Sequence, residues 1–306
     1  MNTIKVLSTK NLSWVNVTKP GEKEIKYLKK KFNFHSLDLK DCLPPLQRPK
    51  LEVRPNYLFM ILLFPVFNRR TKEIYPSEID FFISEDTLVT VHSNKHLTLV
   101  DFFKICQKKS YQEKYLFGSP AILLYEILNR LLLSCYPMLN HINLDIDQIK
   151  KQIFGSYEKK IVREILIIKS NIVIFRKTIQ AHKNVIKKLI INASQFFSTA
   201  RLNIYLDALV EHTREIWDLL EGYKETINAL HETNESLISY RLNEIMKLLT
   251  IISVIMLPAA LIANLFGMNT PGLPFVKIPF AFWIVFFIML LISLGMIRCF
   301  KKKGWF

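Results

Sequence analysis

The sequence predicts an α/β domain followed by a long α-helical region and two membrane-spanning helices. β-rich runs bounded by turn residues occupy the chain to about Ser93. From about Leu97, glycine and proline become scarce and apolar residues recur at helical spacing. Two uncharged stretches then follow each other near the C-terminus, Leu248–Val276 and Ile278–Ile297. These three observations place a mixed domain first, helices next and the membrane segment last.

Short strand-like runs dominate the first part of the chain. "IKVLS" and "WVNVT" alternate between apolar and polar residues, whereas "GEKEIKYLKKKF" has the spacing of a helix. The β-rich runs "LFMILLFPVF", "EIDFFIS" and "TLVTVH" follow, and "LQRPKLEV" introduces one of these strands. We therefore expect residues 1–118 to form an N-terminal α/β cytoplasmic domain.

Three long helical segments are expected after this domain, at approximately 119–154, 158–191 and 194–266. At 1.5 Å per residue the third would be on the order of 100 Å long. A helix of that length cannot bury itself in one globular domain, so it is a coiled-coil arm, a membrane span or both in series. We assign 119–245 to a long-helix cytoplasmic region and stalk, 246–299 to two transmembrane helices, and 300–306 to a basic cytoplasmic tail.

Composition limits the partners. The chain has 306 residues, of which 50% are hydrophobic, yet its net charge is +16. Such an excess of positive charge suggests a polyanion, namely nucleic acid, an anionic membrane surface or a phosphorylated ligand. The basic residues concentrate in the middle helical region, which is either a solvated face or a binding arm. We expect no nucleic-acid partner, because the interleaved aromatic residues of single-strand binders are absent. The basic residues of this region are Lys150, Lys151, Lys159, Lys160, Arg163, Lys169, Arg176, Lys177, Lys183, Lys187 and Lys188.

The two C-terminal stretches have the length of membrane spans. The first supplies about 19 apolar-dominated residues before the turn "LFGMNTPGLP", and the second about 18–20, which a hydrocarbon core of ~30 Å requires. A buried soluble hairpin is the alternative, but two such runs in tandem are rare outside membranes. Basic residues flank both spans on their outer ends, whereas the connecting loop has only Lys277. The positive-inside rule then places both termini in the cytoplasm.

Polar residues of the first span lie on one helical stripe. Steps of three and four residues define this polar stripe, and its 3.5-residue period is that of a left-handed bundle. Small residues could serve close packing, but amides and hydroxyls on one face are costly in lipid and favour a water-filled path. The same period continues backwards through Ser239, Ser236, Glu232, Ala229 and Glu225. One copy cannot enclose a path, so we expect a homo-oligomeric channel. The polar stripe consists of Asn243, Met246, Thr250, Ser253, Leu257, Ala260, Asn264 and Gly267.

The tripeptide Gly267-Met268-Asn269, at the end of the first of two C-terminal spans, resembles the GMN signature of CorA-type divalent-cation channels. "NEIMKLLTIISVIMLP", "QRPK", "TLVTVH" and the tail "KKKGWF" extend the resemblance over nearly the whole chain. It implies a funnel-shaped homopentamer in the cell membrane, with Gly267, Met268 and Asn269 at the external mouth. There the Asn269 carboxamides would contact a hydrated ion, which suits Mg²⁺ because this ion sheds water reluctantly.

The resemblance also implies roles for residues below the mouth. Asn243 matches an amide ring on the cytoplasmic side and Met246 the start of a hydrophobic constriction. Glu232 matches an acidic ring below the membrane. Asp207 and Glu211 match loosely the region where regulatory metal binds. The implied pore-lining residues are Asn243, Met246, Leu249, Thr250, Ser253, Leu257, Ala260 and Asn264.

The cargo is left open by the loop after the signature. "TPGLPFVK" carries no carboxylate and is similar to loops of the ZntB-like branch, which is associated with zinc transport. We expect Mg²⁺ influx driven by the membrane potential and gated by intracellular Mg²⁺, with a Zn²⁺, Co²⁺ or Ni²⁺ transporter as the alternative. A membrane-anchored scaffold or nucleic-acid binder is a further alternative. No phosphate-binding loop and no nucleophile–base pair is found, so we expect neither an enzyme nor a cofactor.

Overall fold

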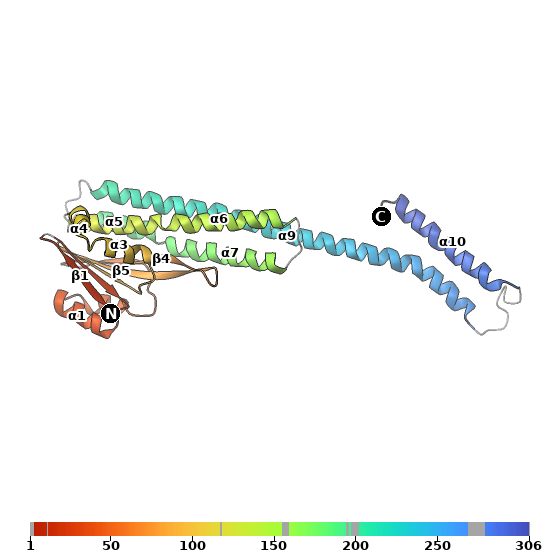
Figure 1. The fold of residues 1–306 in the computed structure, drawn as a ribbon, viewed down its shortest axis with the longest axis horizontal. Coiled ribbons are helices and arrows are strands. Elements are labelled where there is room, and N and C mark those ends of the chain that lie inside the picture. The colour runs from red at the N-terminus through yellow and green to blue at the C-terminus, as the bar shows by residue number, and fades with distance from the viewer. Residues whose placement is uncertain are drawn as a thin grey trace. The chain divides into compact units, whose positions relative to one another are not determined.

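The structure is a computed structural model that describes residues 3–10, 12–116, 118–154, 159–193, 196, 202–268 and 279–305. The chain divides into two compact units, Met1–His231 and Glu232–Phe306. One helix, α9 (Leu202–Phe266), contributes to both units (Figure 1). Each unit is described by itself below.

A six-stranded mixed sheet organises the first unit, in the order β1-β2-β6-β5-β4-β3. β2 and β6 pair in parallel and the other neighbours are antiparallel. The runs expected to be strands are strands, which confirms the α/β prediction, because alternation and β-branched residues are local signals. The strands are β1 (Ile4–Ser8), β2 (Ser13–Thr18), β3 (Lys50–Val53), β4 (Leu58–Asn68), β5 (Glu73–Ile83) and β6 (Thr87–His92).

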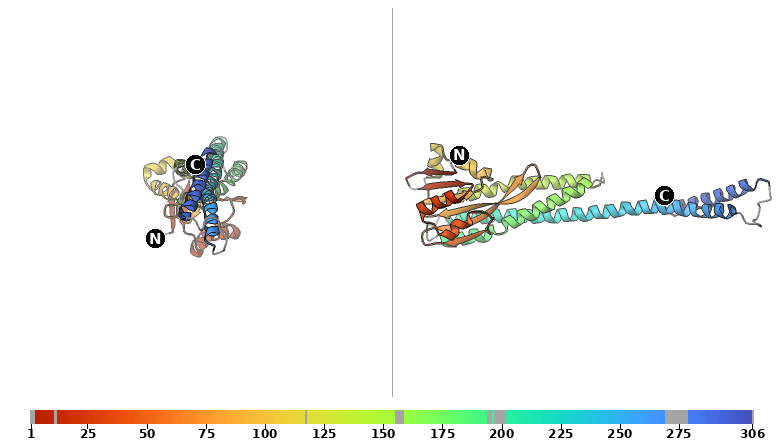
Figure 2. Two further views of the ribbon diagram at one scale, coloured as in Figure 1. Left: turned by 90° about the vertical axis from the view of Figure 1, so that its right-hand side faces the viewer. Right: turned by 90° about the horizontal axis from the view of Figure 1, so that it is seen from below.

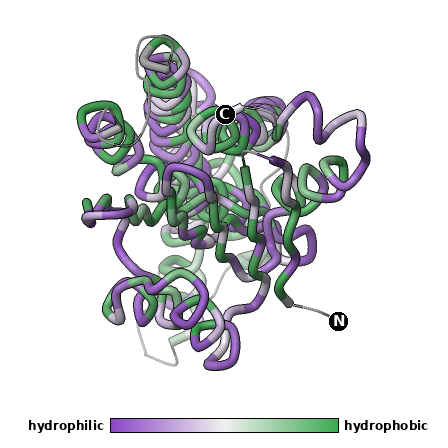
Figure 3. The backbone as a smooth tube through the Cα atoms, turned by 90° about the vertical axis from the view of Figure 1, so that its left-hand side faces the viewer, coloured by the Kyte–Doolittle hydropathy of each residue, from purple (hydrophilic) through white to green (hydrophobic). Residues whose placement is uncertain are grey.

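Helices cover both faces of this sheet, so its central strands are apolar on both sides. In Figure 3 the hydropathy-coloured tube is green along these strands. α1 (Glu22–Phe32) and α2 (Ser36–Asp41) pack on one face, where Leu28 and Leu39 meet Phe82. The opposite face packs on the later helices through residues such as Phe81 and Leu124. These later helices are α3 (Leu97–Ile105), α4 (Lys109–Tyr115), α5 (Pro120–Leu133), α6 (Cys135–Gln152), α7 (Lys159–Ile179) and α8 (His182–Ala193).

The long helical segments differ from the prediction in their boundaries. The first is interrupted between α5 and α6, because Pro137 has no N–H to donate to the Leu133 carbonyl. The Ser134 hydroxyl caps this break by donating to the Leu131 carbonyl at 2.7 Å. The second is interrupted between α7 and α8, where the His182 ring lies 2.6 Å from the Leu63 carbonyl of β4. The third is described as a helix from Leu202 without a break to Phe266, with Pro258 inside it, and most of its predicted first residues lie outside the described ranges.

Within the described residues, three helical stretches are long and apolar enough to cross a membrane, namely Pro120–Gln152, Ile204–Phe266 and Ala281–Lys302. The first is the α5–α6 stretch, and 44% of its apolar window is buried within the chain. The other two windows are only 6% and 0% buried. The apolar surface still uncovered therefore belongs to the C-terminal part of α9 and to α10 (Ala281–Lys302), the two segments that the sequence predicted as spans.

Candidate ion pathway

Every residue of the polar stripe is exposed in the single chain. Leu257, for example, is 71% exposed, although it lies in the middle of an apolar helix. Leu249, which the resemblance placed with the lining residues, is exposed beside the stripe. The stripe thus leaves a continuous face of α9 uncovered within its own unit.

The covered face of α9 lies on the other side of the helix. Ile251 is only 2% exposed, and Ile255, Ile262 and Phe266 are half-buried. At ~100° per residue these positions centre about half a turn away from the polar stripe. In the second unit α10 runs back along the end of α9 (Figures 1 and 2), and the two helices share a cavity. The cavity is lined by Ala263, Phe266, Gly267, Ala281, Phe282, Val285 and Met289.

The hydroxyls of the stripe are oriented by the helix itself. Thr250 Oγ1 donates to the Met246 carbonyl at 2.8 Å, and Ser253 Oγ donates to the Leu249 carbonyl at 2.9 Å. Each hydroxyl proton is therefore used within the helix, and only oxygen lone pairs remain for an outside partner. Such oxygens accept hydrogen bonds from the water shell of a cation.

The turn after the stripe is tightly wound. The Gly267 N–H donates to the Ala263 carbonyl at 2.9 Å, and a Cβ on Gly267 would lie 3.1 Å from the same oxygen. Glycine is therefore favoured by close backbone approach, and not by a left-handed φ. Met268 is exposed directly after it. Asn269 and the "TPGLPFVK" loop lie outside the described residues, so the predicted selectivity ring stays a prediction.

The part of α9 in the first unit repeats the same division. Leu209, Ile216 and Leu220 are buried against the rest of the unit. The exposed side carries mainly acidic residues, and one basic residue among them, Arg214, lies 4.0 Å from Glu211 and 3.8 Å from Asp218. The acidic residues on this side, all exposed, are Asp207, Glu211, Asp218, Glu225 and, at the start of the second unit, Glu232.

A family model described as "CorA-like Mg2+ transporter protein" matches residues 9–302. The chain belongs to this family. The Cobalt/magnesium transport protein CorA of Methanocaldococcus jannaschii is 24% identical over 296 residues, which cover 96% of this chain and 91% of the relative. The protein of the same name from Thermotoga maritima is 25% identical over 296 residues, with coverages of 96% and 83%.

Solved structures confirm the fold of this CorA-like chain. The complete structure of the CorA magnesium transporter from Methanocaldococcus jannaschii matches with a TM-score of 0.85 at 23% identity, covering 98% of this chain and 94% of that one. A ZntB cytoplasmic domain from Vibrio parahaemolyticus matches with a TM-score of 0.62 at 12% identity, covering 76% and 90%. At such identities these matches show the fold alone.

The basic residues of the CorA-like chain do not all form one solvated face. Lys160, Lys177 and Lys183 are exposed, but the guanidinium of Arg176 contacts α9. It forms an ion pair with Glu221 and stacks over the Trp217 ring at 4.6 Å. Arg176 therefore joins α7 to the long helix, a role that sequence reasoning missed, since it depends on two segments far apart in the chain.

The described residues contain no cluster of side chains that could hold a metal ion directly. No three His, Cys, Asp or Glu side chains gather there as a ligand set. The polar stripe likewise contains neither histidine nor cysteine, and its polar groups are amides and hydroxyls. Neutral oxygens suit a hard, hydrated cation better than a soft metal bound directly by the protein.

Proposed function

We propose that this CorA-like chain forms a homo-oligomeric membrane transporter of divalent cations, with Mg²⁺ as its principal cargo. The observation that carries the proposal is the exposed polar stripe on α9, which lies about half a turn from the buried and half-buried residues of the same helix. Several copies with their stripes turned inward would enclose a polar path while α10 faces lipid. Five copies follow from the resemblance to CorA-type channels.

Transport by this path needs no covalent chemistry. The hydroxyls of Thr250 and Ser253 offer acceptor oxygens to the waters of a hydrated ion, and the amides of Asn243 and Asn264 do the same. Asn269 would complete the path with a ring at the external mouth. The apolar positions Leu249 and Leu257, with Met246, would close it by dewetting when the path narrows.

The membrane potential supplies the driving force. With both termini in the cytoplasm, inward movement of two charges gains roughly 4.6 kcal/mol per 100 mV. Residues 1–118 then form the cytoplasmic α/β domain, 119–245 the helical region and stalk, 246–299 the spans, and 300–306 the tail. The exposed carboxylates of Asp207, Glu211 and Glu232 would face neighbouring copies, where cytoplasmic Mg²⁺ can bridge them and close the path.

Cobalt is a second cargo to be tested, because the relatives from Methanocaldococcus jannaschii and Thermotoga maritima are both named cobalt/magnesium transport proteins. Competition for uptake among Mg²⁺, Co²⁺, Ni²⁺ and Zn²⁺ in proteoliposomes separates these cargoes. We expect Mg²⁺ to compete best, since the stripe offers only neutral oxygen groups. Preferred Zn²⁺ uptake would favour the ZntB-like alternative, and no movement of any divalent ion would favour a scaffold.

A cysteine-accessibility experiment tests the path itself. Cys42, Cys106 and Cys135 are buried and Cys299 is exposed. The Cys299→Ser variant therefore has no exposed native thiol that the reagent could modify. In this background we compare Ser253→Cys, on the polar stripe, with Ile255→Cys, on the covered face. Treatment with a charged water-soluble thiol reagent is expected to reduce Mg²⁺ uptake at least about tenfold in the first variant only.

Two further outcomes decide the assignment. Equal inhibition of both variants, or of neither, would show that the stripe is not the path. Asn269→Ala should reduce Mg²⁺ uptake strongly if its carboxamide belongs to the mouth. Robust uptake by that variant would remove Asn269 from the path without affecting the argument for the stripe.

A further inference from the structure

An acidic pair lies on the sheet far from the polar stripe in sequence. Glu78 and Asp80 are two residues apart on β5, so their side chains share one face of the sheet. The strand partners of Asp80 are Ile61 on β4 and Val91 on β6, both members of the apolar cluster under α1 and α2. Asp80 is only 2% exposed. A carboxyl group in such a position is costly unless it is satisfied by a partner.

The partners of the pair leave one oxygen without a hydrogen bond. Glu78 Oε2 accepts from the Gln47 backbone N–H, and the carboxyl of Glu78 lies beside that of Asp80. The Cys42 thiol lines the same cavity, and it donates to the Asp38 backbone carbonyl at 3.4 Å. Oδ1 of Asp80 is buried and has no partner within the described part of the chain. Burial raises the pKa of both carboxyls, and in Asp80 the neighbouring Glu78 raises it further.

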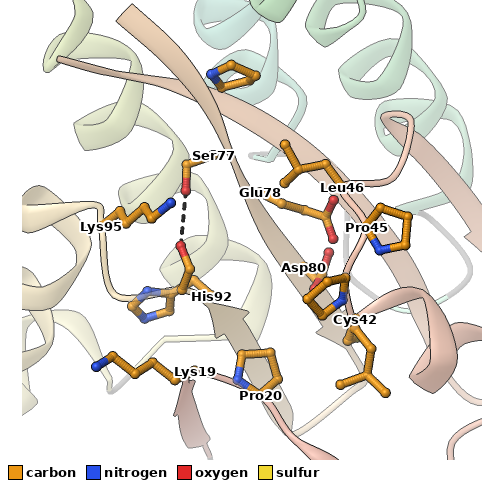
Figure 4. A pocket seen from close by; sticks show the side chains of 14 residues that line it. Lys19, Pro20, Cys42, Pro45, Leu46, Ser77, Glu78, Asp80, His92 and Lys95 are labelled. Carbon is orange, nitrogen blue, oxygen red and sulfur yellow. Dashed lines mark hydrogen bonds between the residues drawn. The ribbon is translucent and has the colours of Figure 1, made fainter. Parts of the chain in front are cut away.

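A cavity of about 370 Å³ opens onto this pair. It is lined by Pro20, Cys42 and Pro45 and by residues of β5. Figure 4 shows the carboxyls of Glu78 and Asp80 pointing toward one another on one side of the cavity, with Lys19 and Lys95 on the other. The Lys95 ammonium stacks over the Tyr75 ring at 5.0 Å, so a separate partner stabilises its charge.

The unsatisfied atom is a carboxyl oxygen, and a cation or the water shell of a cation would satisfy it. We propose that this cavity binds a hydrated divalent cation of the Mg²⁺ type between Glu78 and Asp80. Mg²⁺ is usually held by one or two carboxylates and keeps several of its waters, for which the cavity has room. A closed zinc-type cage does not fit, because the described residues offer no third acidic, histidine or cysteine ligand in a common group. Nearby Asp41 is already paired with Lys50 at 2.8 Å.

This ion site is independent of transport. It lies within the first unit, between β5 and the segment that follows α2, and uses none of the α9 carboxylates. A bound ion would hold the residues around Gln47 against the sheet and satisfy Oδ1 of Asp80. Its test is therefore ion binding and not uptake.

The experiment counts ions on the full-length protein in detergent, with Mn²⁺ as a paramagnetic substitute for Mg²⁺. Electron paramagnetic resonance of free Mn²⁺ gives the number bound per chain, and added Mg²⁺ should displace it. We expect Asp80→Asn and Glu78→Gln each to bind one Mn²⁺ per chain fewer than the unmodified protein. The matched control is Glu85→Gln, an exposed carboxylate just after β5, which should bind as many as the unmodified protein.

Thermal unfolding shows whether the variants are folded. Without metal, Asp80→Asn should unfold at the same or a higher temperature, because an unsatisfied buried carboxyl has been replaced by a neutral amide. If Asp80→Asn does not fold, Glu78→Gln decides. Equal Mn²⁺ counts in the folded variants and the unmodified protein would overturn the site. An equal loss in Glu85→Gln would also overturn it, since binding would then follow overall charge.

Discussion

Removal of one hydroxyl from the polar stripe provides a quantitative test of how ions are accommodated. In the unmodified chain the Ser253 hydroxyl donates its proton to the Leu249 carbonyl at 2.9 Å, and its oxygen faces outward. Ser253→Ala deletes this oxygen. A hydrogen bond contributes about 0.5–1.5 kcal/mol, and a water can partly replace a lost hydroxyl. At about 0.5 kcal/mol per copy, five copies lose about 2.5 kcal/mol, or about 70-fold in rate. The helix should stay intact, because its backbone hydrogen bonds are unchanged.

The matched control is Ser293→Ala, which removes a hydroxyl from α10, away from the stripe. Both variants are reconstituted at equal protein density, and initial Mg²⁺ uptake is measured with an entrapped fluorescent indicator at a fixed potassium diffusion potential. We expect Ser293→Ala to match the unmodified protein within about twofold, a difference of about 0.4 kcal/mol. Equal rates for the two variants would refute the reasoning that stripe hydroxyls contact the hydrated ion.

Two further predictions concern the turn after the stripe and the stability of the first unit. Gly267→Ala places a Cβ 3.1 Å from the Ala263 carbonyl; at about 0.2 kcal/mol per copy, five copies lose about 1 kcal/mol, so uptake should fall about fivefold. Gly295→Ala, with open space around it, should change nothing, and equal effects of the two variants would contradict this account. Burial would raise the pKa of Asp38, but hydrogen bonds from Arg54 and Tyr57 hold it below its usual value. The stability that the ionised Asp38 carboxylate gives to the folded state is therefore present above the pKa of Asp38 in the unfolded chain, and it is lost as pH falls through the pKa of Asp38 in the folded chain. Asp38→Asn should lower the free energy of unfolding by about 2–4 kcal/mol at pH 7. It should also weaken the fall of the unfolding temperature at acid pH, and an unchanged fall would exclude the Asp38–Arg54 ion pair as its source.

Local patterns predicted most of the fold. The strands β4 and β6 and the helix α1 are found where their periodicity placed them, and the long helix α9 ends at Phe266 as predicted. The exposed face of α9 was also foreseen, because a 3.5-residue repeat of polar and small residues is visible in the sequence alone. The breaks near Ser134 and His182 were not foreseen. The first has a local sign in Pro137, whereas the second depends on a contact with β4.

Long-range neighbours explain what the sequence did not reveal. Glu78 and Asp80 belong to a run that reads only as a strand, and their significance depends on the 42–47 segment that lies over them. Arg176 was one basic residue among many until α7 and α9 placed it beside Trp217. Gly267 and Met268 lie exposed at the end of α9, and the role of Gly267, Met268 and Asn269 at a mouth stays a prediction for the uptake experiments.

Pro258 divides the long helix mechanically. Since proline has no N–H, the carbonyl of Val254 lacks its usual partner four residues ahead, and the helix bends most easily at this point. The segment from Pro258 to Gly267 spans about 14 Å at 1.5 Å per residue. If the polar stripes line a path as proposed, a bend at Pro258 would move Gly267 while the helix before Pro258 keeps its register.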